Sequence, residues 1–140
     1  MAAEDALKRV EAVLESWRSL PTGPTCADFR AVAGGEGIEV GTGDPGAAEP
    51  VFAMVPGTSD FDTGCEQLLR PMVNEGVFKS NAFCKADGQA VRCTLMTPTS
   101  VPRVLTFVPH GEGLWLQKIE WQRKTGRPIP PDDDDDDLPL

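Results

Sequence analysis

The sequence predicts one α+β domain, in which an amphipathic helix precedes an antiparallel sheet and an acidic tail follows. Apolar residues recur at helical spacing near the N-terminus, strand-like segments separated by short turns follow residue 77, and the last residues are rich in Pro and Asp. A chain of 140 residues can bury a core of its own. We therefore expect residues 1–123 to form a single domain and residues 124–140 a disordered Pro-rich acidic tail.

The first helix is predicted by the spacing of its apolar residues. Between Glu4 and Leu20, residues such as Val10, Leu14 and Trp17 fall on one side of a helix, and charged residues fall on the other. Proline and glycine begin at Pro21 and end the pattern. A tryptophan on such an apolar stripe belongs to the core more often than to a ligand pocket, and both interpretations stay open.

Two further helices are predicted by their N-terminal capping patterns. Thr25 followed by Asp28 is a variant of the capping box and predicts a short helix. Thr63 and Glu66 match the standard box, so a second helix is expected to start there. Pro71 removes a backbone donor inside that helix and should kink or divide it.

Strands are predicted wherever β-branched and aromatic residues lie between turn signals. The first two segments are separated by a turn at Gly43 to Gly46, and the later four follow one another through short connections, which favour antiparallel neighbours. The expected strands cover residues 38–41, 51–55, 77–85, 90–97, 103–108 and 114–122.

The four cysteines predict free thiols. Cys26, Cys65, Cys84 and Cys93 form no C-x-x-C pair, and a single histidine cannot complete a zinc site, so no metal is expected. A turn that pairs Cys84 with Val91 would leave Cys93 diagonal to Cys84, which favours two buried thiols over a bridge. With no signal-peptide pattern at the start, the expected location is intracellular, in the cytoplasm or an organelle interior.

The charge of the chain is concentrated in its tail. Removing the six aspartates at 132–137 from the net charge of −9 leaves −3, which argues against a nucleic-acid-binding surface. The tail could solvate the chain, bind a divalent cation or mimic nucleic acid for a basic partner. A modest basic patch is formed by Lys118, Arg123, Lys124 and Arg127. No apolar stretch is long enough to span a membrane.

Candidate catalytic groups are few. Asp28, Asp60 and Asp62 could supply a general base, although aspartates ahead of a helix also favour the positive end of its dipole. His110 lies in a Gly-rich turn with Glu112 as its nearest acidic neighbour, and the chain has no tyrosine. No phosphate loop or dinucleotide fingerprint is present, so no cofactor is expected.

The order of elements resembles the SnoaL-like and ketosteroid-isomerase-like families of the nuclear transport factor 2 superfamily. The resemblance covers about residues 4–123 and includes a closing pattern at Val104–Val108 and Gly113–Trp121. It implies helices packed on a curved antiparallel sheet that forms a cone-like half barrel around an apolar pocket. The lining implied for that pocket is Trp17, Phe52, Met54, Phe107, Trp115 and Trp121.

Such a fold serves several functions, so function has to be argued from the site. We expect a noncatalytic binding or interaction module with a small apolar ligand, as a homodimer or with a protein partner, because titratable groups are scarce. The alternative is an isomerase or cyclase that uses Asp28, Asp60 or Asp62 as base. A third hypothesis is an acidic mimic acting through Asp132 to Asp137.

Overall fold

A computed structural model describes residues 3–43, 49–57, 59–97, 101–111 and 113–122. Several predictions fall outside these residues: the tail at 124–140, the turn at Gly43 to Gly46 beyond its first residue, Glu112, and the basic patch apart from Lys118.

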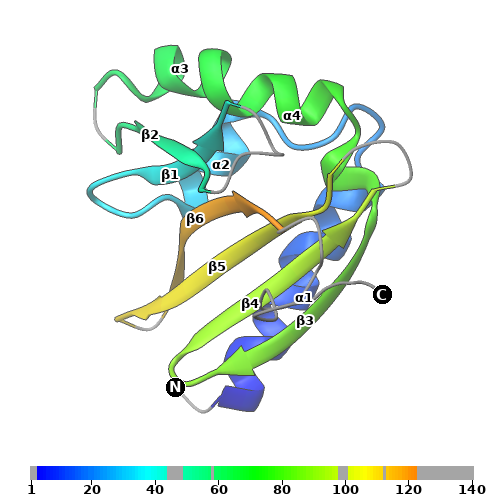
Figure 1. Ribbon diagram of the computed structural model, residues 1–140. Coiled ribbons are helices and arrows are strands. Elements are labelled where there is room, and N and C mark those ends of the chain that lie inside the picture. The colour runs from blue at the N-terminus through cyan, green and yellow to red at the C-terminus, as the bar shows by residue number, and fades with distance from the viewer. Residues whose placement is uncertain (1–2, 44–48, 58, 98–100, 112, 123–140) are drawn as a thin grey trace, which may run out of the picture.

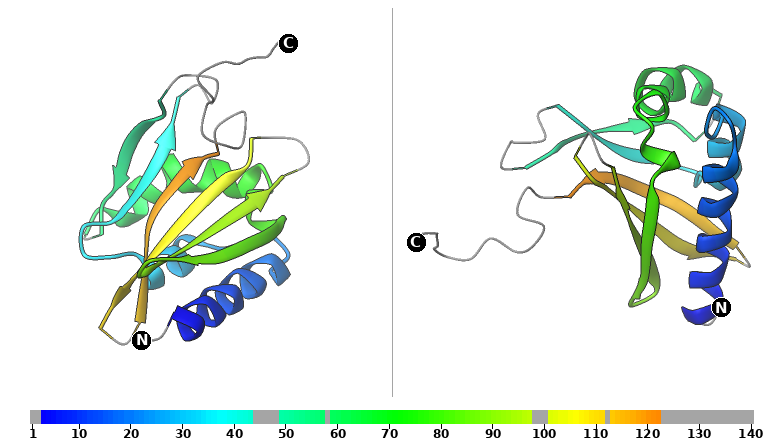
Figure 2. Two further views of the ribbon diagram at one scale, coloured as in Figure 1. Left: turned by 60° about the horizontal axis from the view of Figure 1, so that its bottom comes forward. Right: turned by 90° about the vertical axis from the view of Figure 1, so that its right-hand side faces the viewer.

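The helical elements lie on one side of a sheet (Figures 1 and 2). Helix α1 packs against the strands at one end of the sheet, and a chain of short helices covers the other end. Their bounds are α1 Ala3–Ser19, α2 Cys26–Val32, α3 Phe61–Gly64, the π-helical turn η1 Cys65–Leu69, α4 Arg70–Asn74 and the 3₁₀ turn η2 Val77–Lys79.

The described strands form one six-stranded sheet in the order β2-β1-β6-β5-β4-β3. Neighbours pair antiparallel except β1 and β6, which run parallel through Val40 and Ile119. The strands are β1 Ile38–Thr42, β2 Val51–Val55, β3 Asn81–Asp87, β4 Ala90–Met96, β5 Arg103–His110 and β6 Gly113–Trp121. The sheet is therefore mixed and not wholly antiparallel as expected. The pattern of turns predicts that consecutive strands pair, but it does not predict how β1 pairs with β6, which is far from it in the chain.

One face of the sheet is buried under the helices. Val91, Leu105, Phe107 and Ile119 point to this inner face and are almost fully buried, and they form one core with the apolar side of α1. An irregularity in pairing at Thr106/Phe107 shifts the register between β5 and β6, and such bulges bend and twist the strand that carries them. The predicted α+β class, with helices packed on a curved sheet, is confirmed (Figure 2).

Three aromatic rings join the helices within this core. Trp17 of α1, Phe29 of α2 and Phe78 of η2 contact one another edge to face, with centroid separations of 5.1, 5.7 and 5.2 Å. Edge-to-face contacts of this kind add to the free energy of burying each ring. Trp17 is therefore a core residue, the first of the two interpretations left open by the sequence.

The cysteines form two disulfides, so the prediction of free thiols is wrong. Cys26 is bonded to Cys65, which joins α2 to η1, and Cys84 is bonded to Cys93 across the β3–β4 hairpin. The hairpin places Cys84 directly opposite Cys93, with a Cα–Cα distance of 4.0 Å. The prediction centred a two-residue turn on Asp87 and Gly88, whereas the observed two-residue connection is Gly88 and Gln89, and this shift of register brings the thiols together.

The capping box at Thr25 is confirmed, whereas the one at Thr63 is wrong. The Thr25 hydroxyl accepts a hydrogen bond from the Asp28 amide, and the Asp28 carboxylate accepts one from the Thr25 amide. Thr63 instead lies inside α3, which begins at Phe61 because that ring is fully buried. The expected division near Pro71 is present: α3 passes through η1 before α4.

The strand expected over 77–85 starts later than predicted. Val77 and Phe78 are consecutive and both buried, which a strand with alternating sides does not allow. A 3₁₀ turn after Gly76, whose φ is +83°, points both side chains into the core, and β3 begins at Asn81.

Replacing each disulfide by a pair of serines should lower the free energy of unfolding by amounts that follow the length of the closed loop. The Cys26–Cys65 pair spans 39 positions and the Cys84–Cys93 pair spans 9, which corresponds to about 4 and about 2.5 kcal/mol. Urea unfolding of the two double variants measures the difference. Alkylation of four thiols in the denatured, unreduced wild-type chain would contradict the assignment.

Thr25→Ala should lower the free energy of unfolding by about 1 kcal/mol, because it leaves an amide at the start of α2 without its partner. Thr63→Ala is the matched control, since Thr63 is an exposed residue inside a helix. It should change stability by less than about 0.5 kcal/mol. Equal losses in the two variants, measured by thermal or urea unfolding, would contradict the observed caps.

Candidate functional site

A cleft of about 430 Å³ opens between α4 with η1 and the adjoining ends of β1, β5 and β6. In Figure 1, α4 lies above the C-terminal end of β6, which ends at Trp121. The lining mixes apolar and polar residues on both the helix side and the sheet side. It includes Leu68, Pro71, Met72, Val101, Trp121, Arg103, Glu75 and Gln67, together with Gly41, Thr42 and Gly43.

Arg103 is the charged residue that this cleft shares with the core. It alternates with Leu105 and Phe107 along β5, so its side chain points to the inner face, and it is 7% exposed. One terminal nitrogen, Nη1, donates to the carbonyl of Val101, and the other, Nη2, lies 3.3 Å from Oε1 of Glu75. Among the described residues, the Nε–H group is buried with no hydrogen-bond partner.

The surroundings of Arg103 compensate its charge incompletely. Burial lowers the pKa of the Arg103 guanidinium below its ordinary value, and the Glu75 carboxylate opposes that shift in part. The Glu75 side chain is 43% exposed, so water screens its attraction for the guanidinium. A buried charge with an unused donor costs stability. The cleft therefore contains a cationic group, Arg103, that still has an N–H donor available for a hydrogen-bond acceptor.

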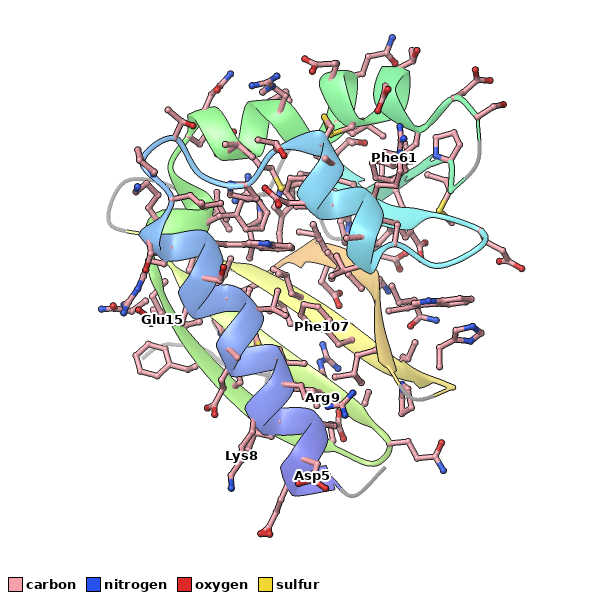
Figure 3. All side chains as sticks on the ribbon, turned by 180° about the vertical axis from the view of Figure 1, so that it is seen from behind. Asp5, Lys8, Arg9, Glu15, Phe61 and Phe107 are labelled. Carbon is pink, nitrogen blue, oxygen red and sulfur yellow. A yellow bond between two sulfur atoms is a disulfide. The ribbon has the colours of Figure 1, made fainter. Side chains whose placement is uncertain are left out.

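Three of the six predicted pocket residues lie on the inner face, but only one of them lines the cleft. Trp17 of α1 and Phe107 of β5 are buried in the core between the helices and the sheet (Figure 3 labels Phe107). Trp121 pairs with Arg103 across β5 and β6 and lines the cleft.

The other three predicted pocket residues lie on the opposite face of the sheet. Phe52 and Met54 alternate with inner residues of β2, and the ammonium of Lys118 lies 4.6 Å from the centroid of the Phe52 ring. Trp115 stacks with His110, with centroids 3.3 Å apart. The six residues are thus divided between two faces and do not meet in one pocket.

The predicted catalytic aspartates lie outside the described cleft lining. Asp28 caps α2, and Asp62 forms an ion pair with Arg30 while its side chain stays 73% exposed. Asp60 precedes α3 on the surface without a side-chain capping bond. None of the three is among the described residues that line the cleft.

A second hollow, of about 360 Å³, lies between α1 and the edge strand β3. Three of its polar residues are paired with one another: Arg18 donates to Asn81 and to Glu15 at 2.7 Å each. The described residues contain no cluster of His, Cys, Asp and Glu that could hold a metal ion. They also contain no helix long and apolar enough to cross a membrane.

Sequence reasoning missed both charged residues of the cleft. A signal was present for Arg103, because an arginine in phase with the inward-facing Leu105 and Phe107 is a charge at a core position. Glu75 carried no such signal, since it lies at the end of a helix, where a charged side chain is normally exposed. Its proximity to Arg103 depends on how α4 lies over the sheet.

Comparison with known proteins does not assign the chain to a family. No family model and no curated protein matches it. Among solved structures, it is similar to a chain whose title begins Rd1NTF2_05, with 9% sequence identity and a TM-score of 0.41. The match covers 85% of this chain and 95% of that one. The resemblance to SnoaL-like and ketosteroid-isomerase-like proteins, which the order of elements suggests, stays a prediction.

Arg103→Met should leave the free energy of unfolding unchanged or raise it by about 1–4 kcal/mol, because it removes a desolvated charge and leaves Glu75 in contact with water. Leu105→Ala, at the neighbouring inward position, should lower it by about 2–5 kcal/mol. Urea unfolding of both variants tests the account. A loss of similar size in Arg103→Met would show that the guanidinium is a structural support.

Proposed function

We propose that this chain is a noncatalytic binding module that holds a small apolar molecule in the cleft between α4 and the sheet. The observation that supports it is the cleft itself. Its volume of about 430 Å³ is in the range of small-molecule sites, and its walls are built from Leu68, Met72, Trp121 and other apolar side chains.

The isomerase or cyclase alternative receives less support from the same geometry. It needs a carboxylate base that faces the substrate. Among the described lining residues Glu75 is the acidic one, and Arg103 already engages its carboxylate. Asp28, Asp60 and Asp62 lie outside the described lining, so none of the three is placed to face a substrate in the cleft.

We propose from its disulfides that the protein is located in an oxidising compartment. Structural disulfides form and persist mainly in oxidising compartments, and two of them join elements of this fold. The expected intracellular location was argued in part from free thiols, and the two disulfides remove that part of the argument. The predicted homodimer stays a proposal, and the exposed Phe83, Met96 and Met54 of the face opposite the helices would suit it.

The uncharged fluorescent probe N-phenyl-1-naphthylamine tests the proposed site. It should bind saturably, with an increase in fluorescence, at about one molecule per chain. Leu68→Trp fills the cleft from its helix side and should weaken this binding about tenfold or more, because the volume available to the probe disappears. Native mass spectrometry of the same samples reports the number of bound molecules and of subunits.

Ala12→Trp is the matched control, since Ala12 is an exposed residue of α1 and adds the same ring far from the cleft. It should leave probe binding unchanged. The proposal would be wrong if the probe did not bind saturably. It would also be wrong if Leu68→Trp left binding intact while Phe52→Ser on the opposite face abolished it.

A further inference from the structure

We propose that the ligand of this cleft carries a carboxylate, which Arg103 binds through its Nε–H and a neighbouring N–H. This inference rests on the proposed function and adds the chemical class of the ligand: a small apolar carboxylic acid. It starts from a donor that the fold leaves unused.

The unused donor is the Nε–H of a residue placed at a core position. Buried polar groups in folded proteins almost always have a hydrogen-bond partner, and an orphaned one costs free energy. Arg103 is 7% exposed and lines the cleft, and its Nε has no partner among the described residues. A ligand that accepts this hydrogen bond would supply the missing partner.

The guanidinium geometry favours a carboxylate for that role. Adjacent N–H groups of an arginine form a planar fork that matches the two oxygens of a carboxylate. The existing partners leave room for it, because the Val101 carbonyl engages only Nη1 and the Nη2–Glu75 contact, at 3.3 Å, is long. The Glu75 side chain is partly exposed, so it can turn toward solvent when the carboxylate of a ligand binds Arg103.

The charge of the site argues for a monoanion. Arg103 and Glu75 are the charged residues among the described lining, and their charges cancel. A phosphate dianion would meet one cation and one carboxylate, which is an unfavourable balance. A carboxylate next to an aliphatic or aromatic body places one negative charge on Arg103 and leaves the body for Leu68, Met72 and Trp121.

The test compares 1-naphthaleneacetate with 1-naphthaleneacetamide, which has the same shape and no charge, by isothermal titration calorimetry on the full chain. The wild-type protein should bind the acid about tenfold or more tightly than the amide, as expected for hydrogen bonds to a charged group. Arg103→Met should reduce this preference to about one. Arg103→Lys should restore part of it, since an ammonium retains the charge but not the fork.

Two more variants separate recognition from general electrostatics. Arg92→Met removes a half-buried arginine from the opposite face, where it pairs with Asp87 and Glu120, and should leave the preference unchanged. Glu75→Gln removes the competing carboxylate and should raise the affinity for the acid severalfold. A guanidinium that served only the fold would give no such gain.

The inference is overturned if the wild-type protein binds acid and amide equally, or binds neither, or if the preference survives in Arg103→Met. These outcomes differ from a failure of the proposed function. If N-phenyl-1-naphthylamine binds in the cleft but acid and amide bind equally, the apolar site stands and the carboxylate class is wrong. If the acid binds through Arg103 and the uncharged probe does not bind, the carboxylate class stands instead.

Discussion

The parallel pairing of β1 with β6 is the constraint on which the rest of the architecture depends. It joins the hairpin of β1 and β2 to the meander of β3 to β6, so that strands from both halves of the chain form one sheet. The helices that follow β2 then return over the inner face of this sheet, and the Cys26–Cys65 disulfide ties η1 to α2 there. The cleft lies where this covering layer meets the ends of β1, β5 and β6.

The same arrangement explains why a charge lies at a core position. The alternation of β5 points Arg103 inward at the strand end where the helix layer leaves a cleft. There the guanidinium is removed from most of its hydration, and the partly exposed Glu75 replaces that hydration incompletely. Farther along the strand, Leu105 and Phe107 meet closed packing. The site and the core are thus two regions of one face, distinguished by how completely the helices cover it.

Local signals in the sequence were sufficient for most of the elements. The apolar stripe of α1, the cap at Thr25, the interruption near Pro71 and the antiparallel meander all depend on residues close together in the chain. Thr63 shows the limit of such signals, because burial of Phe61 starts α3 earlier than the capping pattern indicates. Tertiary packing decided that boundary.

Long-range contacts set what the sequence could not predict. The Cys84–Cys93 bond follows from the register of a hairpin, and a small error in the expected turn displaced one cysteine from the other. The predicted pocket was a set of apolar residues, mostly aromatic, and the sequence did not show on which face of the sheet each side chain would lie. Phe52 and Trp115 consequently lie on the face opposite Trp121. The Arg103–Glu75 pair depends on the placement of α4, which no local pattern specifies.

The most direct measurement is a two-dimensional ¹⁵N–¹H spectrum of the arginine Nε–H groups during a titration with 1-naphthaleneacetate. In the free protein, the Arg103 Nε–H is buried and unpaired among the described residues. On titration its resonance should shift as a hydrogen bond forms, saturating with the calorimetric affinity, while that of Arg92 should stay in place. An unmoved Arg103 resonance at saturating ligand, with shifts confined to the face of Phe52 and Met54, would contradict the account.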